Sequence, residues 1–215
     1  MAHDARPWHD ANHPVHVTLR VRRGVASLRT FRVAAAIGAG LRRAAQSNDA
    51  KPSARRATFR VVHFSIQPDH LHLIVEASSK TALARGMQGV ASGLARRVNR
   101  RLGRRGALFA DRYHAHALRG PTEVRNAIVY VLQNHRKHPE PVPDLGTAPI
   151  GGLDPCSSAR WFAGWAHAPP APDEPAPVAP ARTWLLRAGW RRAGAGTIAR
   201  TERPRAARGL EGAHS

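Results

Sequence analysis

Cysteine, lysine and acidic residues are scarce in this chain of 215 residues, and long apolar runs are absent. The single cysteine, Cys156, excludes an internal disulfide and any metal site built from several cysteines, which fits a reducing cytoplasm. The longest apolar stretch, residues 33–41, is too short to cross a bilayer, and residues 1–14 lack the apolar centre of a signal peptide. We therefore expect a cytoplasmic protein without a membrane partner.

The scarcity of acidic residues leaves a large excess of positive charge. Lys and Arg total 34 against 14 Asp and Glu, which gives a formal net charge of +20. Nearly all of this charge is arginine, because lysine occurs only at Lys51, Lys80 and Lys137. A codon bias toward arginine explains the choice of residue, and phosphate recognition by the guanidinium fork explains it equally. The excess itself points to a polyanionic partner, because codon bias does not account for it.

Hydrophobic periodicity predicts the order β-α-β-β-α-β followed by a further helix. Alternation of apolar and polar residues is typical of strands, and apolar residues three and four apart are typical of helices. This order is the split βαβ or ferredoxin-like pattern of an α+β fold, an antiparallel sheet of about four strands with two helices on one face. The expected elements are strand 16–23, helix 30–47, strand 58–66, strand 70–77, helix 81–103, strand 112–118 and a last helix over 121–137.

The composition changes after this pattern ends, which predicts several segments along the chain. Residues 168–180 are rich in Pro and Ala and predict an extended, poorly packed linker. Residues 182–192 predict a short amphipathic basic helix that docks on the domain or on nucleic acid. The expected organisation is a disordered lead at 1–14, a catalytic domain at 15–138, a linker at 139–181, the basic helix at 182–192 and a disordered tail at 193–215.

Two histidine pairs in this chain have the spacing of neighbouring residues on one face of a strand. In "HLHLIVEA", His70 and His72 project from one face while Leu71 and Leu73 fill the other. Two neutral imidazoles placed in this way can bind one divalent cation and leave coordination positions for substrate oxygens. "YHAH" places His114 and His116 at the same spacing, so spacing alone does not separate the pairs. Chance also explains such a motif in a chain with 13 histidines.

The last helix supplies a candidate reacting group. Its core-facing stripe consists of Val124, Ala127, Ile128, Val131 and Leu132. Tyr130 falls on the other side with Asn134 one turn further on, so the two are expected to be neighbours on the helix surface. The only other tyrosine, Tyr113, lies beside the second histidine pair.

Three blocks of the sequence together resemble the single-tyrosine HUH transposases, and within them the REP-associated tyrosine transposases. These blocks are "HFSIQPDHLHLIVEA", "GRRGALFADRYHA" and "YVLQNHRKH", and the resemblance covers residues 15–138. It implies that His70 and His72 bind Mg²⁺ or Mn²⁺, that Tyr130 is the nucleophile and that Asn134 completes the metal site. The family usually continues from that Asn into a Pro-Val-Arg segment, whereas this chain reads "NHRKHP".

The resemblance also implies a reaction and its partners. The tyrosine attacks a phosphate of single-stranded or hairpin DNA and forms a 5′-phosphotyrosine with a free 3′-OH. Rejoining is the same reaction run in reverse, so DNA transposition proceeds without ATP. Relatives of this class include homodimers that share active sites and others that act as monomers.

A basic cluster between the two histidine pairs is the predicted DNA-binding surface. Any single arginine here is better explained as part of a solvated helix face or loop. As a cluster the arginines predict a phosphate-binding ridge, with the Phe109 ring as a stacking platform for an unpaired base. The predicted members are Arg97, Arg101, Arg104, Arg105, Phe109 and Arg112.

Two alternatives to the transposase hypothesis remain open at this point. Two-histidine phosphoesterases also use ferredoxin-like halves, but they require His-x-Ser or His-x-Thr twice, and this chain has His-x-His. The second alternative is a domesticated transposase domain that binds a DNA sequence or hairpin without strand transfer. The presence of His70, His72, Tyr130 and Asn134 favours retained chemistry over this alternative.

Overall fold

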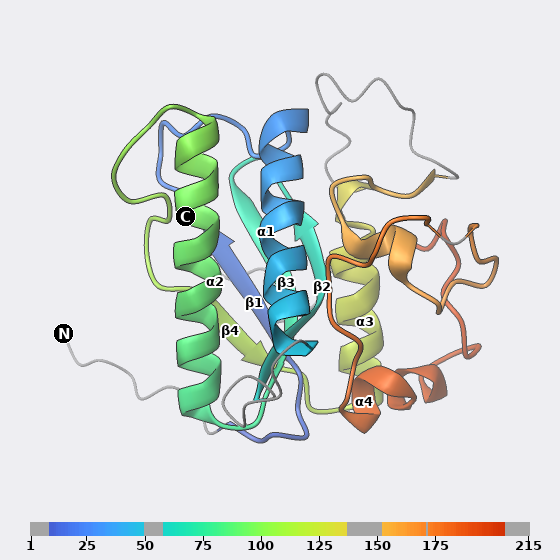
Figure 1. Cartoon of the computed structure of the whole chain (residues 1–215). Coiled ribbons are helices and arrows are strands. Elements are labelled where there is room, and N and C mark those ends of the chain that lie inside the picture. Colours follow the sequence, from blue (N-terminus) through green and yellow to red (C-terminus); the bar gives the residue numbers. More distant parts are fainter. Residues whose placement is uncertain (1–8, 50–57, 137–151, 171, 205–215) are drawn as a thin grey trace.

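Four strands and three helices make up the part of the fold that precedes residue 137. The structure, a computed structural model, describes residues 9–49, 58–136, 152–170 and 172–204. The order β-α-β-β-α-β followed by a helix is confirmed (Figure 1). The elements are β1 (Val15–Arg20), α1 (Phe31–Asp49), β2 (Phe59–Ile66), β3 (His70–Ala77), α2 (Lys80–Arg101), β4 (His114–Ala117) and α3 (Pro121–Leu132).

The strands form one antiparallel sheet in the order β2-β3-β1-β4. This is the strand order of a ferredoxin-like fold, so the predicted α+β class is correct. β1 and β3 occupy the centre, with Thr18 opposite His72 and Arg20 opposite His70. The histidine pair at 70 and 72 therefore lies on a central strand, and the pair at 114 and 116 lies on the edge strand β4.

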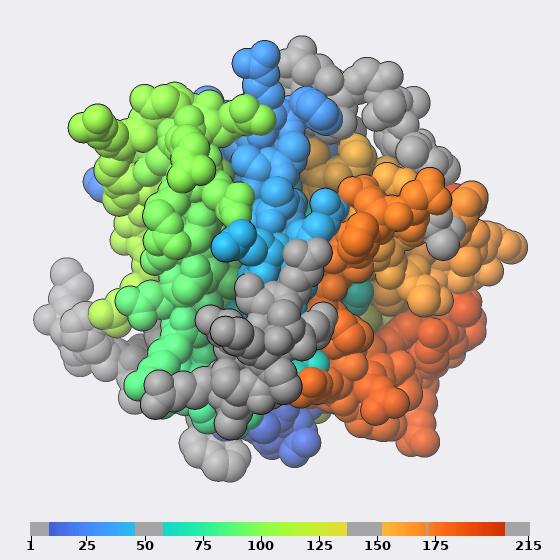
Figure 2. Space-filling view, viewed as in Figure 1, coloured from blue at the N-terminus to red at the C-terminus, as the bar shows by residue number. Residues whose placement is uncertain are grey.

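Helices α1 and α2 cover one face of the sheet. They lie in front of the strands in Figure 1 and form much of the near surface in Figure 2. Leu71, Leu73 and Val75 of β3 point into the core between the sheet and these helices. The helical stripe of α2 meets them with Leu83, Met87, Val90, Leu94 and Val98, as the sequence period predicts. The N-terminus of α2 is capped by the Ser79 hydroxyl, which accepts a hydrogen bond from the backbone N–H of Ala82.

Helix α3 and the C-terminal segment, residues 152–204 apart from residue 171, pack around a second core. Val62 and Ile74 of the sheet belong to this core together with seven residues of α3. The C-terminal segment contributes Phe162, Trp165 and Trp190, all buried. It lies at the right in Figure 1, beside α3.

The boundary predicted at residue 139 is too early, because the C-terminal segment begins with a packed stretch. Leu153 and Cys156 are buried, and the 3-10 helix η3 (Ser158–Trp161) hydrogen-bonds to β2 through the Ser158 hydroxyl and the backbone N–H of Phe64. Burial raises the pKa of the Cys156 thiol to about 12, so this thiol is protonated at neutral pH. Apolar residues scattered among Pro and Gly build this packing without a helical or strand period, which is why the sequence pattern does not reveal it.

The remaining predicted segments differ in outcome. The Pro/Ala-rich stretch 168–180 contains no helix or strand among its described residues, and the backbone N–H of Ala179 bonds to the Val61 carbonyl of β2. The basic helix expected at 182–192 is present as α4 (Trp184–Arg187) and the 3-10 helix η4 (Gly189–Arg192). The lead at 1–14 is described from residue 9, where the His9 ring bonds to the Ala77 carbonyl. Residues 1–8 and 205–215 lie outside the described residues. None of the helices in the described ranges is both long and apolar enough to span a membrane.

Candidate active site

His70 and His72 project from the face of the sheet opposite α1 and α2. Their Nε2 atoms lie 2.9 Å apart, so the two rings converge on one point. The period of the strand predicts this shared orientation, and neither ring enters the core beneath α1 and α2. His72 is buried at 2% exposure, and the His70 side chain keeps 17% of its surface exposed. The point of convergence is therefore reached from the His70 side.

A hydrogen-bond partner orients each of these imidazoles through its Nδ1 atom. Nδ1 of His70 lies 2.6 Å from a carboxylate oxygen of Asp69, and Nδ1 of His72 lies 3.2 Å from the hydroxyl of Thr18 on β1. Partial burial raises the pKa of Asp69, but the hydrogen bond and charge of His70 together with Arg20 lower it below its usual value overall. Asp69 is therefore ionised at neutral pH. Partners of this kind fix the ring orientation and tautomer of metal-binding histidines.

Tyr130 of α3 lies against this pair within the same chain. Its ring meets the His72 ring edge to face, with centroids 5.0 Å apart and an angle of 74° between the planes. The expected position of Tyr130 on the polar side of its helix is wrong, because the side chain is only 6% exposed. The C-terminal segment covers the side of α3 that the sequence predicts to be open, so α3 is buried on both sides.

His16 on β1 is a member of the site that the sequence analysis missed. Its ring stacks on His72 with centroids 5.1 Å apart and lies 5.9 Å from the Tyr130 ring. Burial, together with the charges of His116 and His70, lowers the pKa of His16 to about 3, so this imidazole is neutral under physiological conditions. Its Nε2 has no hydrogen-bond partner among the described residues. The alternation of β1, combined with the ferredoxin-like pairing of β1 to β3, would have placed His16 and Thr18 on the face of His72.

Asn134 lies just beyond α3, which ends at Leu132 and not near residue 137 as expected. It is the first residue of the 3-10 helix η1 (Asn134–Arg136), and its side chain is buried at 2% exposure. The preceding residue turns away from the histidines, because the Gln133 amide donates to the Ala199 carbonyl. Among the described residues, no hydrogen bond joins Asn134 to either imidazole. The tighter turn after Gln133 changes the i, i+4 relation that the sequence predicts for Tyr130 and Asn134.

The second histidine pair lies on the edge strand β4. His114 is exposed on β4, and the His116 ring lies 3.5 Å from a carboxylate oxygen of Glu123. Tyr113 packs against the core beneath α1 and α2, on the other side of the sheet. Tyr130 packs against the other pair, at 70 and 72, through the His72 ring.

The predicted DNA-binding residues do not form one cluster, and Arg97 lies on the face of the sheet opposite the convergent histidines. Arg97 lines a cavity of about 360 Å³ between α1 and α2 with Arg43, Arg96 and Arg100, on the opposite face of the sheet. Arg101, Arg105 and Arg112 are exposed at the end of α2 and in the loop that follows.

Two members of that set have packing roles in the structure. Arg104 donates to the Asn99 side chain and to the Ala107 carbonyl, so its fork holds the loop together. Phe109 is half-buried against the core, and its backbone pairs with that of Val21.

A family model matches the part of the chain that contains most of the candidate site. The family described as "Transposase IS200 like" matches residues 47–134. This range includes His70, His72, Tyr130 and Asn134. This match agrees with the resemblance to the tyrosine transposases.

A solved structure described as a REP-associated tyrosine transposase bound to a REP hairpin is similar to the chain as well. The identity is 18% and the TM-score 0.48, over 81% of this chain and 99% of that chain. No curated protein sequence matches the chain.

Proposed function

We propose that this protein cleaves and rejoins single-stranded DNA through Tyr130. The observation that carries the proposal is the edge-to-face packing of the Tyr130 ring on His72, at the point where the Nε2 atoms of His70 and His72 converge. The family match supports the same class of reaction. One chain supplies both the imidazoles and the tyrosine, so a second copy is not needed to complete this set of residues.

The chemical step requires a nucleophile and two proton transfers. The phenol oxygen of Tyr130 attacks the scissile phosphorus, the new O–P bond forms, and the bond from phosphorus to the 3′ oxygen breaks. The phenol loses its proton, and the departing 3′ oxygen gains one to become a free 3′-OH. The product is a 5′-phosphotyrosine, which keeps the phosphodiester energy so that a 3′-OH can reverse the step.

The donor atoms at the site fit a divalent cation. The two Nε2 atoms lie 2.9 Å apart, and both Nδ1 atoms are engaged by Asp69 and Thr18. No group of three or more His, Cys, Asp or Glu side chains suited to a metal occurs in the described ranges. We infer that His70 and His72 hold the cation and that oxygen atoms from Asn134 and the substrate complete its ligands. A cation bound there supplies charge neutralisation at the scissile phosphate.

Removal of the Thr18 hydroxyl is expected to weaken metal binding. Thr18→Val keeps the shape of the side chain but leaves Nδ1 of His72 without its partner, so affinity for Mn²⁺ should fall about 10- to 100-fold. Calorimetric titration with Mn²⁺ in the absence of DNA measures this directly. Thr18→Ser restores the hydroxyl and should return affinity to near that of the parent protein. Equal affinity in all three proteins would contradict the assignment of His72 as a ligand.

Binding of DNA is expected to depend steeply on salt. The formal charge of +20 and the exposed arginines at the end of α2 favour neutralisation of phosphates with release of counterions. A plot of log K against log salt for single-stranded hairpin DNA should be linear with a negative slope of several units. A flat plot would mean that the charge reflects codon bias alone.

The reaction itself is tested by trapping the covalent product. The protein is incubated with Mn²⁺ and labelled single-stranded hairpins, and the reaction is resolved on a denaturing gel. A band of protein covalently joined to the 5′ part of the cleaved strand supports the proposal. Binding without this band on every hairpin tried would favour the second candidate, a DNA-binding protein without strand transfer.

A further inference from the structure

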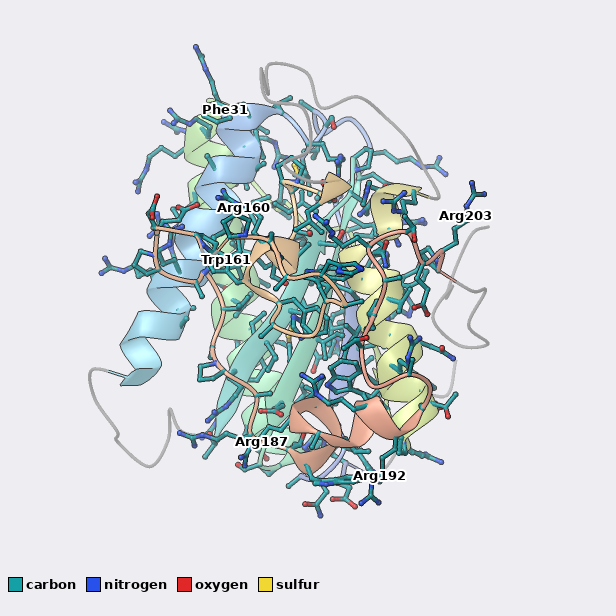
Figure 3. All side chains as sticks on the ribbon, turned by 90° about the vertical axis from the view of Figure 1, so that its right-hand side faces the viewer. Phe31, Arg160, Trp161, Arg187, Arg192 and Arg203 are labelled. Atoms are coloured by element: carbon teal, nitrogen blue, oxygen red, sulfur yellow. The ribbon has the colours of Figure 1, made fainter. Side chains whose placement is uncertain are left out.

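An exposed tryptophan marks a surface of the C-terminal segment that lies outside the family match. Trp184, the first residue of α4, is 51% exposed. Among the described residues only one other large apolar side chain is comparably exposed, Phe31 at 52%. Figure 3 shows Phe31 at the opposite end of the molecule from α4 and η4. A single exposed apolar side chain is ordinary on a protein surface, so a partner for Trp184 has to be argued from the groups around its ring.

The short helices α4 and η4 are amphipathic. Leu185, Leu186 and Trp190 are buried in the second core, where η4 packs along α3. The exposed side carries Trp184 and three arginines, of which Arg191 is engaged with the Trp190 ring and the Gly196 carbonyl, whereas Arg187 and Arg192 lie toward solvent. Arg187 and Arg192 both lie at the α4 end of the molecule in Figure 3. The sequence predicts that the basic helix at 182–192 docks on the domain or on nucleic acid. In the structure, α4 and η4 pack on α3 with their buried side, and the side with Trp184 remains exposed.

The indole of Trp184 is held in place by two contacts with η4. A Cβ placed on Gly189 would lie 2.7 Å from a ring carbon of Trp184, so the ring rests directly on the backbone of this glycine. The guanidinium of Arg192 lies 5.2 Å from the ring centroid, within the range of a cation–π contact. The start of α4 is fixed as well, because the Thr183 hydroxyl donates to buried Glu76. An ordered ring loses little conformational entropy when a ligand stacks on it.

Charge distinguishes this surface from the surroundings of Trp161, another tryptophan with an arginine beside its ring. Arg160 lies 5.8 Å from the Trp161 ring centroid, but Glu174 pairs with Arg160 at 3.8 Å. Arg187 and Arg192 have no ion pair with a carboxylate in the described part of the chain. The positive charge beside Trp184 is therefore available to an anionic partner.

We propose that Trp184, Arg187 and Arg192 form a binding site for single-stranded DNA. An unpaired base stacks on the exposed face of the indole, and the arginines contact the phosphates on either side of that base. The class of partner rests on the proposed function, whereas the site lies in the C-terminal segment and takes no part in the chemistry at Tyr130. η4 packs on α3, so a DNA strand bound at this site lies on an element that contacts the helix carrying Tyr130.

Fluorescence anisotropy with labelled oligo(dT) of about twelve nucleotides tests the site in the full chain without metal. Trp184→Ala should weaken binding about tenfold, because stacking of one base is lost. Trp184→Phe keeps an aromatic face and should retain most of the affinity. Phe31→Ala is the matched control for loss of an exposed aromatic ring, and it should bind like the parent protein. A duplex of the same length should bind the parent and Trp184→Ala equally.

The arginines are tested through the salt dependence of the same binding. Arg192→Gln should reduce the slope of log K against log salt by about one, and Arg160→Gln should leave it unchanged. Unchanged affinity in Trp184→Ala, or an equal loss on the duplex, would overturn the proposal. The outcome is separate from that of the adduct assay: loss of binding in Trp184→Ala without any adduct in the parent contradicts the chemistry and not this site.

Discussion

Replacing Tyr130 with Phe is expected to abolish the covalent protein–DNA adduct while DNA binding persists. The change removes one oxygen, which is the only atom of the side chain able to form the ester with phosphorus. No other residue of α3 has a hydroxyl near the histidines, because the remaining buried residues of this helix are apolar. Adduct formation should therefore fall to background at any metal concentration.

The fold should tolerate this substitution. Phe retains the ring that packs edge to face on His72 and fills the same space in the second core. Loss of a buried hydroxyl costs about 1 kcal/mol of unfolding free energy, a minor part of the stability of a domain. Urea unfolding followed by circular dichroism checks this, and anisotropy with labelled hairpin DNA checks that binding remains within a fewfold of the parent.

Tyr113→Phe is the matched control for the adduct assay. Tyr113 packs against the core beneath α1 and α2, so its phenol does not share a site with His70 and His72. This variant should form the adduct at the parental rate. If Tyr113→Phe lost the adduct and Tyr130→Phe kept it, the site would have to be rebuilt around His114 and His116.

Much of the fold and half of the site follow from local patterns. The period of two in β3 places His70 and His72 on one face, whatever packs around them. The ferredoxin-like order follows from the sequence of strands and helices, because handedness and short connections leave few ways to arrange them. These features are local, and local features are what a single sequence encodes most directly.

The surroundings of Tyr130 could not be predicted, because they depend on contacts between distant segments. The pattern of α3 shows one apolar stripe, yet the helix packs on the sheet through Val62 and Ile74 and is also covered by the C-terminal segment. Phe162, Trp165 and Trp190 make that cover, and their spacing matches neither a helix nor a strand. His16 also belongs to the site only through contacts between distant segments, since its ring reaches His72 through the pairing of β1 with β3.

A second large effect is expected when Asp154 is replaced by Asn. Its carboxylate accepts two hydrogen bonds from the Arg29 guanidinium, at 2.9 and 3.0 Å, and one from the backbone N–H of Cys156. Both side chains are almost fully buried, at 1% exposure for Asp154 and 6% for Arg29. Asn keeps the shape but removes the carboxylate charge from this buried ion pair. Removal of one partner from a buried ion pair costs about 3–5 kcal/mol of unfolding free energy.

Glu174→Gln is the matched control, because Glu174 also belongs to the C-terminal segment and also pairs with arginines. Its partners Arg42 and Arg160 lie at the surface, where such pairs contribute about 0–1 kcal/mol. Urea denaturation should show a much lower midpoint for Asp154→Asn, with a single transition and an unchanged m-value, and little change for Glu174→Gln. Arg29 precedes α1 and also donates to the Ile66 carbonyl at the end of β2, so Asp154 ties the C-terminal segment to the sheet. Equal midpoints for Asp154→Asn and the parent protein would mean that this segment does not unfold together with the sheet, and the boundary near residue 139 would have to be restored.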